Sequence, residues 1–217
     1  MIDPVSIWTL EWVPDGPRGF VRDLRLRWAC EETGVPYVMR TVPFDDRATN
    51  HLDTQPFGQV PMLEDGEIRI FESGACVLHL ARRSDVLMPH DAVGEAQVIQ
   101  WLFAAVNSIE MVTMPWVVLK WSDQEFAAIT EWMDSRLTQL EAVLATREWL
   151  VSDRFTAADL LMADTLRVPL VRTSGKRPAS EAYVARITSR PAFIKAHADQ
   201  LAFYAAADTK REATGKA

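Results

Sequence analysis

Residues 57–81, with the sequence FGQVPMLEDGEIRIFESGACVLHLA, restrict the possible folds more than any other stretch of this chain. Residues 60–63 are a short apolar run, and residues 68–71 alternate apolar and polar side chains; both patterns are typical of strands. Between them, residues 64–67 predict a hairpin turn, because an Asp-Gly pair tolerates unusual backbone angles. A helix is expected to begin at residues 72–73. This stretch therefore predicts a strand, a tight turn, a second strand and a helix in immediate succession.

The proline in this stretch points to a ligand-binding role. Pro61 has no N–H for a strand ladder, so we expect an edge strand whose backbone is left for another partner. An extended peptide binds to such an edge through main-chain hydrogen bonds, which Val60 would supply. At the helix start, Ser73 is placed to bind a carboxylate beside unpaired backbone N–H groups, and Glu72 to accept from an ammonium group. The alternative is that Ser73 only caps the helix and Glu72 is an exposed strand end.

Composition and charge argue against several other kinds of protein. The chain has 217 residues and a formal net charge of −7, which argues against a general nucleic-acid-binding surface. No apolar run approaches the length of a membrane span, and residues 1–4 lack the basic and apolar regions of a signal peptide. We therefore expect a cytoplasmic protein that binds neither nucleic acid nor a membrane.

The cysteines and histidines predict neither a redox pair nor a metal site. Cys30 and Cys76 fall within apolar helical patterns, where free cysteines usually behave as small buried hydrophobes. The four histidines show no spacing typical of metal ligands. We therefore expect no disulfide and no metal cofactor.

A change of rhythm near residue 84 predicts two domains. Before it, residues 5–10 and 37–42 are expected to be strands and residues 20–33 a helix. With the hairpin and the helix after it, the order is that of a thioredoxin-like domain. The predicted division is a thioredoxin-like domain over residues 1–84, a proline-broken linker over 85–93 and an all-helical domain over 94–217.

The second half is predicted to be helical throughout. From Gly94 onward, apolar residues recur at helical spacing as far as Trp116. Residues 122–125, Ser-Asp-Gln-Glu, predict a capping box before a second apolar stripe. Thr156 and Asp159 predict another, in which Thr156 caps the helix and Asp159 reaches back to its start. We expect Asp159 to stabilise a buried helix end and to take no part in ligand binding.

Taken together, these features resemble the glutathione transferase family. The Val-Pro pair, the Glu-Ser pair, the capping box and an Arg-Pro break near the last helix occur in the family's order, over almost the whole chain. The resemblance implies an α/β thioredoxin-like N-terminal domain followed by an all-α helical-bundle C-terminal domain. It also implies a cis bond before the proline, glutathione as co-substrate without a metal, and a homodimer. The glutathione-binding residues that it implies are Gln59, Val60, Pro61, Glu72 and Ser73.

One residue that the resemblance leads us to expect is missing. Members of this family lower the pKa of the glutathione thiol with a hydrogen bond from a Tyr, Ser or Cys near the end of the first strand or the start of the first helix. Residues 10–29 contain none of these, nor a Thr. The possible substitutes are the indole N–H of Trp12, the guanidinium of Arg18 or Arg22, and backbone N–H groups at the helix start. Arg18 would add positive charge to its donors. The alternative is that Trp12 packs against neighbouring residues and both arginines are solvated.

An apolar pocket is expected beside the thiol, because Met and Trp side chains suit an adaptable hydrophobic site. The alternative is that these side chains pack in the core, as such residues on helices commonly do. The candidates for the pocket wall are Trp8, Phe20, Met111, Met114 and Trp116.

The favoured function is therefore a glutathione S-transferase-like enzyme that conjugates the glutathione thiolate to a small hydrophobic electrophile. The alternative is a non-catalytic glutathione-binding or protein-assembly module with the same fold, which the missing activator favours. A glutathione-dependent reductase or isomerase is disfavoured because the first loop contains no Cys. Because one fold serves many substrates, the sequence does not identify the electrophile.

Overall fold

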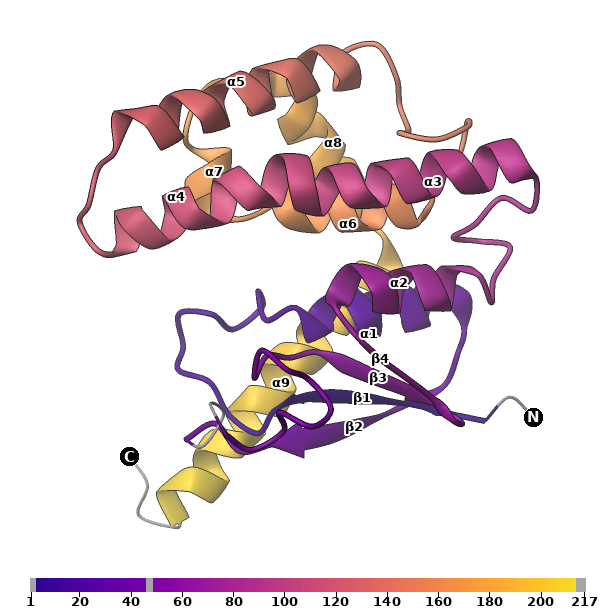
Figure 1. The fold of residues 1–217 in the computed structure, drawn as a ribbon, viewed down its shortest axis with the longest axis vertical. Helices are drawn as coiled ribbons and strands as arrows, with labels where there is room; N and C mark the ends of the chain where they lie inside the picture. Colours follow the sequence, from indigo (N-terminus) through magenta and orange to yellow (C-terminus); the bar gives the residue numbers. More distant parts are fainter. Residues whose placement is uncertain (1–2, 46–48, 214–217) are drawn as a thin grey trace. The chain divides into compact units, whose positions relative to one another are not determined.

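The computed structural model describes residues 3–45 and 49–213, and the chain forms two compact units (Figure 1). The first unit contains residues 1–83 and 191–217, and the second contains residues 84–190. This division differs from the predicted one at the C-terminal end, where residues 191–217 group with the first unit. The reason is that the last helix, α9 (Pro191–Ala213), packs on the first helix, α1 (Asp23–Thr33).

The first unit is built on a four-stranded sheet whose order is β2-β1-β3-β4. β1 pairs with β2 in parallel, while β3 is antiparallel to both β1 and β4. The chain order of strands and helices matches the predicted one, and α2 follows β4 directly. The bounds of these elements are β1 Val5–Leu10, β2 Tyr37–Val42, β3 Met62–Asp65, β4 Ile68–Phe71 and α2 Ser73–Ala81.

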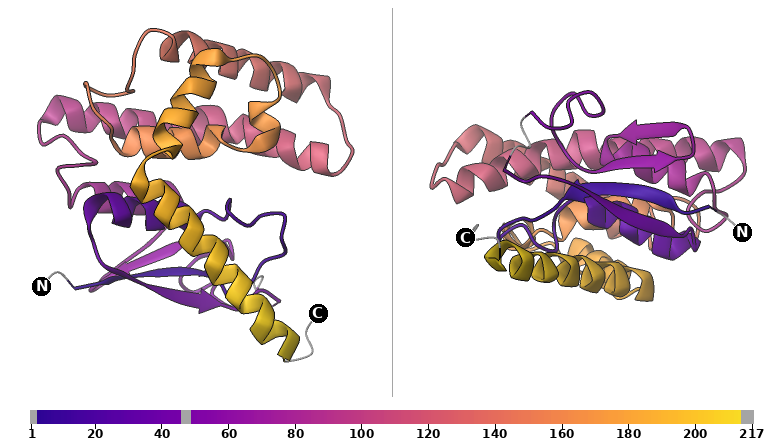
Figure 2. Two further views of the ribbon diagram at one scale, coloured as in Figure 1. Left: turned by 180° about the vertical axis from the view of Figure 1, so that it is seen from behind. Right: turned by 90° about the horizontal axis from the view of Figure 1, so that it is seen from below.

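The central strand β1 shows which face of the sheet carries the core. Val5, Ile7 and Thr9 are fully buried, whereas the residues between them are only half-buried. Thr9 forms a hydrogen bond with the hydroxyl of Tyr204 on α9 (Oγ1–Oη 3.0 Å), so the buried face is the one that α9 covers. Figure 2 shows α9 crossing this unit beside α1. Because side chains alternate along a strand, Trp8 lies on the opposite face of the sheet.

Two details of the hairpin differ from the sequence-based expectation. Asp65 pairs with Ile68, so residues 64 and 65 belong to β3 and the turn contains only Gly66 and Glu67. Gly66 has φ 61°, a left-handed conformation in which glycine is favoured. The strand after Pro61 is also not an edge strand, because β3 lies between β1 and β4. Pairing on both sides of β3 starts at Met62, so the backbone of Val60 lies just outside the ladder.

The second unit is helical, as predicted. A long helical run is formed by α3 and α4 with a π-helical segment, η1, between them, and α6 packs against α3 and η1. All ten residues of α6 are buried. The helices are α3 Ala92–Ala104, η1 Ala105–Glu110, α4 Met111–Trp121, α5 Ala127–Leu144, α6 Ala157–Leu166, α7 Pro169–Arg172 and α8 Pro178–Thr188.

Of the two predicted capping boxes, one is confirmed and one is wrong. Thr156 and Asp159 form the reciprocal box at the start of α6. The predicted box at residues 122–125 does not form, because α5 begins after Phe126, which provides no side-chain cap. Ser122 instead ends α4, and its hydroxyl donates to the carbonyl of Val118 (3.0 Å).

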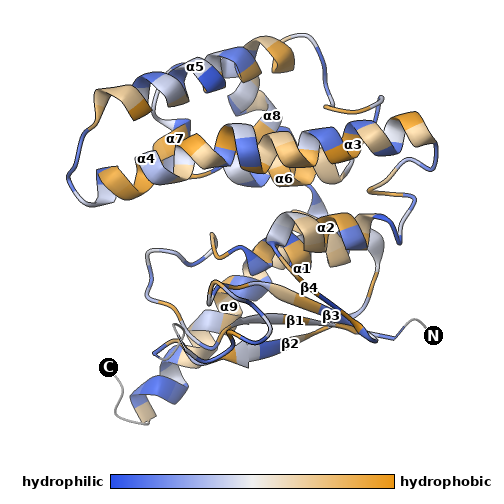
Figure 3. Ribbon diagram, in the orientation of Figure 1, coloured by the Kyte–Doolittle hydropathy of each residue, from blue (hydrophilic) through white to orange (hydrophobic). Residues whose placement is uncertain are grey.

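The helical run Ala92–Trp121 is long and apolar enough to cross a membrane, judged by length and composition alone. Hydrophobic residues recur along it in Figure 3. This differs from the expectation that no such run exists in the chain. Val98, Leu102 and Val112 on this run are buried, and the run packs on α6 and α5. Because a core helix passes the same test, one such run is weak evidence for a membrane span.

Candidate functional site

The register of the sheet brings three segments of the first unit to one end. β1 runs antiparallel to β3, and Trp8 near the end of β1 lies opposite Met62 at the start of β3. Met62 in turn lies opposite Phe71 at the end of β4. The loop after β1, the Val60-Pro61 pair before β3 and the Glu72-Ser73 pair after β4 therefore meet at the same end of the sheet. These are the segments in which the predicted ligand-binding residues and thiol activators lie.

The Val60-Pro61 peptide bond is cis, as the resemblance implied. Pro61 is buried, Val60 is half-buried and Gln59 is exposed. Two side chains hold the loop that leads to this bond. Gln55, which is 2% exposed, accepts hydrogen bonds from the backbone N–H groups of Phe57 and Gln59. The His51 ring nitrogen Nε2 lies 3.0 Å from the carbonyl oxygen of Gln59. Predicted binding residues are thus supported by side chains that sequence reasoning missed.

The Glu72-Ser73 pair begins α2 in an unusual backbone conformation. Glu72 is the cap residue and has φ 70° and ψ 114°, a region that non-glycine residues rarely adopt and that often marks a functional site. Its side chain is exposed. Ser73 is the first helical residue and therefore is not the cap residue of this helix. Ser73 is 7% exposed, and its hydroxyl accepts a hydrogen bond from Arg25 on α1 (Nη1–Oγ 2.9 Å).

The two side chains predicted to activate a thiol are both engaged by one carboxylate on α9. The indole N–H of Trp12 donates to Asp208 (Nε1–Oδ1 2.7 Å). Arg18 donates to both oxygens of Asp208, each at 2.6 Å. These hydrogen bonds, of which the one from Arg18 has the largest effect, lower the pKa of Asp208 to about 2.

Arg18 also donates to a backbone carbonyl of its own loop. Nε and Nη2 donate to the carbonyl of Val13, at 3.1 and 2.9 Å. Arg18 Nη1 also forms an ion pair with the exposed Asp15 (Nη1–Oδ1 3.1 Å). Four hydrogen bonds, to Val13 and Asp208, therefore hold a guanidinium that has five N–H groups. In the structure Arg18 and Trp12 thus both bind α9 through Asp208, and their role in thiol activation stays a prediction.

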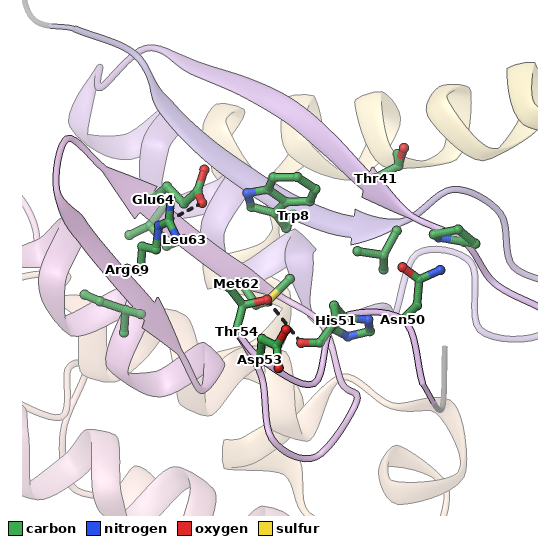
Figure 4. Close-up of a pocket in the computed structure, with 13 residues that line it drawn as sticks. Trp8, Thr41, Asn50, His51, Asp53, Thr54, Met62, Leu63, Glu64 and Arg69 are labelled. Carbon is green, nitrogen blue, oxygen red and sulfur yellow. Dashed lines mark hydrogen bonds and ion pairs between the residues drawn. The ribbon is translucent and has the colours of Figure 1, made fainter. Parts of the chain in front are cut away.

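Trp8 lies away from the core face, in a hollow on the other face of the sheet (Figure 4). The cavity has a volume of about 300 Å³ and is also lined by Met62, Ile70 and His51. An ion pair between Arg69 and Glu64 (Nε–Oε1 3.3 Å) closes one side of it. The structure thus places Trp8 at the same end of the sheet as the predicted glutathione residues, on the face opposite α9.

The other predicted pocket residues are divided between the two units. Phe20 lies in the loop before α1 and is half-buried. Met111 and Met114 belong to α4 in the second unit, where Met111 is 47% exposed. Trp116 is buried in that unit, and its indole N–H donates to Thr130 on α5 (3.2 Å). The structure thus gives Trp116 a packing role within the helical unit.

Cys30 and Cys76 are buried free thiols, and burial raises the pKa of each to about 12. Within residues 3–45 and 49–213, no group of three or more His, Cys, Asp or Glu side chains could hold a metal ion.

Arg25 is the site residue that sequence reasoning missed most clearly. It is 2% exposed on α1, where Asp23 and Arg27 are buried as well. Residues 23–28 alternate charged and apolar side chains, which leaves no simple apolar helix face. This lack of an amphipathic pattern was the available signal. Asp23 and Arg27 pair with each other (Oδ2–Nε 2.7 Å), and Gln200 on α9 donates to Asp23 (2.7 Å).

Comparisons with known proteins agree with this architecture. Residues 17–82 match the glutathione S-transferase N-terminal domain and residues 105–191 match the C-terminal domain. A glutathione S-transferase of Hyoscyamus muticus is 30% identical over 178 residues, which cover 71% of this chain and 84% of that protein.

Two solved structures share the fold. Ure2p in complex with glutathione has a TM-score of 0.76 and 22% identity, and the match covers 90% of this chain and 99% of that one. A glutathione transferase from Burkholderia graminis, solved with two glutathione molecules bound per subunit, has a TM-score of 0.75 and 22% identity over 89% of this chain and 87% of that one. From the matched domains and the relative at 30% identity, we conclude that the chain belongs to the glutathione S-transferase family.

Proposed function

We propose that the first unit binds glutathione at the end of the sheet where Val60, Glu72 and Ser73 meet. The observation that carries this proposal is the strained Glu72 at the start of α2, which lies at the same end of the sheet as Val60. The backbone of Val60 lies outside the ladder and is suited to pair with the main chain of a tripeptide. Ser73 and the backbone N–H groups of α2 suit a carboxylate, and Glu72 suits an ammonium group. Glutathione complexes among the structural neighbours support the same ligand.

The reaction that we propose is conjugation of glutathione to a small hydrophobic electrophile. The thiol first loses its proton to solvent. The thiolate then attacks an electrophilic carbon, so that a C–S bond forms and the leaving group departs with the electron pair of the bond that breaks. Because Trp12 and Arg18 are engaged by Asp208, the remaining candidates for lowering the thiol pKa are backbone N–H groups at the start of α1.

A non-catalytic glutathione-binding module is the second candidate, and one observation favours it. The loop after β1 contains no Ser, Thr, Tyr or Cys, and its two strongest donors already bind Asp208. A protein of this kind would bind glutathione without lowering the pKa of its thiol. We further propose that either form is a cytoplasmic homodimer, in which α2 and the helical run from Gly94 contribute to the interface.

Titration of glutathione with detection of thiolate absorbance tests both candidates. The enzyme should bind glutathione and lower the pKa of its thiol, whereas the module should bind it with an unchanged pKa. Ser73→Ala should weaken binding by about 1–3 kcal/mol, the usual range for a buried hydrogen bond to a charged group. Ser6→Ala, near the start of β1 and away from the start of α2, is the matched control and should bind normally. Absence of binding by the unaltered protein would reject both candidates.

A further inference from the structure

Arg25 and Ser73 form a buried contact between two helices of the first unit. Arg25 lies on α1 and Ser73 begins α2, and these two helices pack together. The guanidinium Nη1 donates to the Ser73 hydroxyl at 2.9 Å, and the two residues are 2% and 7% exposed. A hydrogen bond of this length in a buried place holds both groups in one geometry.

The direction of this hydrogen bond determines what Ser73 can offer to a ligand. A Ser hydroxyl has one O–H donor and two acceptor lone pairs, while a guanidinium has donors only. When Arg25 donates to Ser73 Oγ, the Ser73 O–H cannot point at Arg25 and must be directed elsewhere. The hydroxyl is thereby set as a donor, and donation from a guanidinium makes its proton a stronger hydrogen-bond partner for an anion.

We propose that Arg25 is a positioning residue of the glutathione site, which fixes the Ser73 hydroxyl as a donor and so selects a carboxylate over a carboxamide at that place. A carboxylate accepts hydrogen bonds only, whereas a carboxamide presents both an acceptor and an N–H₂ donor. A carboxamide can therefore satisfy the Ser73 donor with only one of its two ends, and it carries no negative charge. This inference rests on the proposed function, because the carboxylate is that of the γ-glutamyl group of glutathione.

The test compares two ligands on matched variants by calorimetry. The ligands are glutathione and its analogue in which the α-carboxylate of the γ-glutamyl group is replaced by a carboxamide. Arg25→Met should weaken glutathione binding by about tenfold or more, which corresponds to one lost charge-assisted hydrogen bond. It should weaken binding of the amide analogue by less than about threefold, since the preference for the carboxylate is what Arg25 provides.

A double-mutant cycle separates positioning from a general structural effect. In a Ser73→Ala background, Arg25→Met should cause little further loss of glutathione affinity, because the hydroxyl that it orients is gone. Arg25→Lys keeps a buried cationic donor and should restore part of the carboxylate preference. Arg27→Met removes a neighbouring buried arginine whose partner is Asp23, and it should leave the ligand preference unchanged. Thermal unfolding of each variant checks that the fold is retained.

Three outcomes would overturn the proposal. The first is equal loss of both ligands in Arg25→Met, and the second is an additive loss in the Ser73→Ala background. The third is equal affinity of the unaltered protein for the two ligands, which decides the question even if Arg25→Met does not fold. If the unaltered protein binds neither ligand, the proposed glutathione function itself fails. Binding of glutathione with any of the three outcomes above rejects only the role of Arg25.

Discussion

Asp159 gives the sharpest prediction, because four hydrogen bonds converge on its buried carboxylate. Oδ1 accepts from the backbone N–H of Leu150 and from the hydroxyl of Tyr183, both at 2.9 Å. Oδ2 accepts from the backbone N–H of Thr156 at 2.9 Å and from its hydroxyl at 3.1 Å. Asp159 is fully buried. The carboxylate therefore joins the start of α6 to the segment before it and to α8.

The expected cost of Asp159→Ala follows from the donors that it strands. The N–H groups of Leu150 and Thr156 and the hydroxyl of Tyr183 would lose their acceptor in a buried place, and each such group costs about 1–3 kcal/mol. Burial of the carboxylate is itself unfavourable and raises the pKa of Asp159. The substitution removes this penalty, which offsets part of the cost. We expect a net loss of about 3–5 kcal/mol, or roughly 10 °C in Tm for a chain of this size.

Urea unfolding followed by circular dichroism measures this loss, and two variants make the result specific. Asp159→Asn keeps one acceptor oxygen for Leu150 and Tyr183 but turns an N–H₂ group toward the Thr156 N–H, so about half of the loss is expected. Asp153→Ala, an exposed carboxylate in the preceding loop, should change stability by less than about 0.5 kcal/mol. If Asp159→Ala were as stable in urea as Asp153→Ala but did not bind glutathione, the capping argument would be refuted and Asp159 would belong to a ligand site.

Three further predictions concern the first unit and the assembly. Arg18→Ala and Trp12→Phe should lower the melting temperature and leave the pKa of bound glutathione unchanged, because both donors bind Asp208; a raised thiol pKa in either variant would return that residue to the active site. The folded state lowers the pKa of Asp208 to about 2, below its usual value. The stability that Asp208 contributes is therefore present above about pH 4 and is lost as the pH falls toward 2. Asp208→Asn should remove this pH dependence from acid unfolding curves. Sedimentation should give about twice 24.5 kDa at micromolar concentration, and a species of 24.5 kDa would count against the homodimer.

The sequence was most informative where a local pattern decides the structure. Residues 5–10 and 37–42 form the expected strands β1 and β2 because their composition and length suit a sheet, and the two short strands of the hairpin follow the same rule. The Thr156–Asp159 box formed because its donors and acceptors lie within one helical turn. The similar motif at residues 122–125 does not form a capping box, because Asp123 adopts φ 51° and Ser122 ends α4. A short motif therefore predicts a cap only when the neighbouring chain lets the helix start there.

Contacts between distant parts of the chain could not be predicted in this way. Arg18 and Asp208 are separated by 190 positions and Arg25 and Ser73 by 48, and no periodicity relates the members of either pair. The same limit explains why α9 was predicted to belong to the helical domain. The helical spacing of its apolar residues does not indicate which unit they pack on. Buried charges such as Arg25 break the amphipathic pattern of α1. Such breaks are where a sequence signals a site without naming the partner.

The link between α9 and the loop after β1 bears directly on whether the protein is an enzyme. In this family the loop normally presents a thiol activator, and here its two strongest donors hold Asp208 of the last helix. Arg18 donates four hydrogen bonds to carboxylate and carbonyl oxygens, so the guanidinium is held in the geometry that binds α9. Asp208→Ala would release both donors, so the thiol pKa of bound glutathione in that variant is informative. A lower pKa than in the unaltered protein would mean that Arg18 is able to activate the thiol but is held away by α9. An unchanged pKa would mean that the loop serves only to anchor α9, and any activation would then have to come from backbone N–H groups at the start of α1.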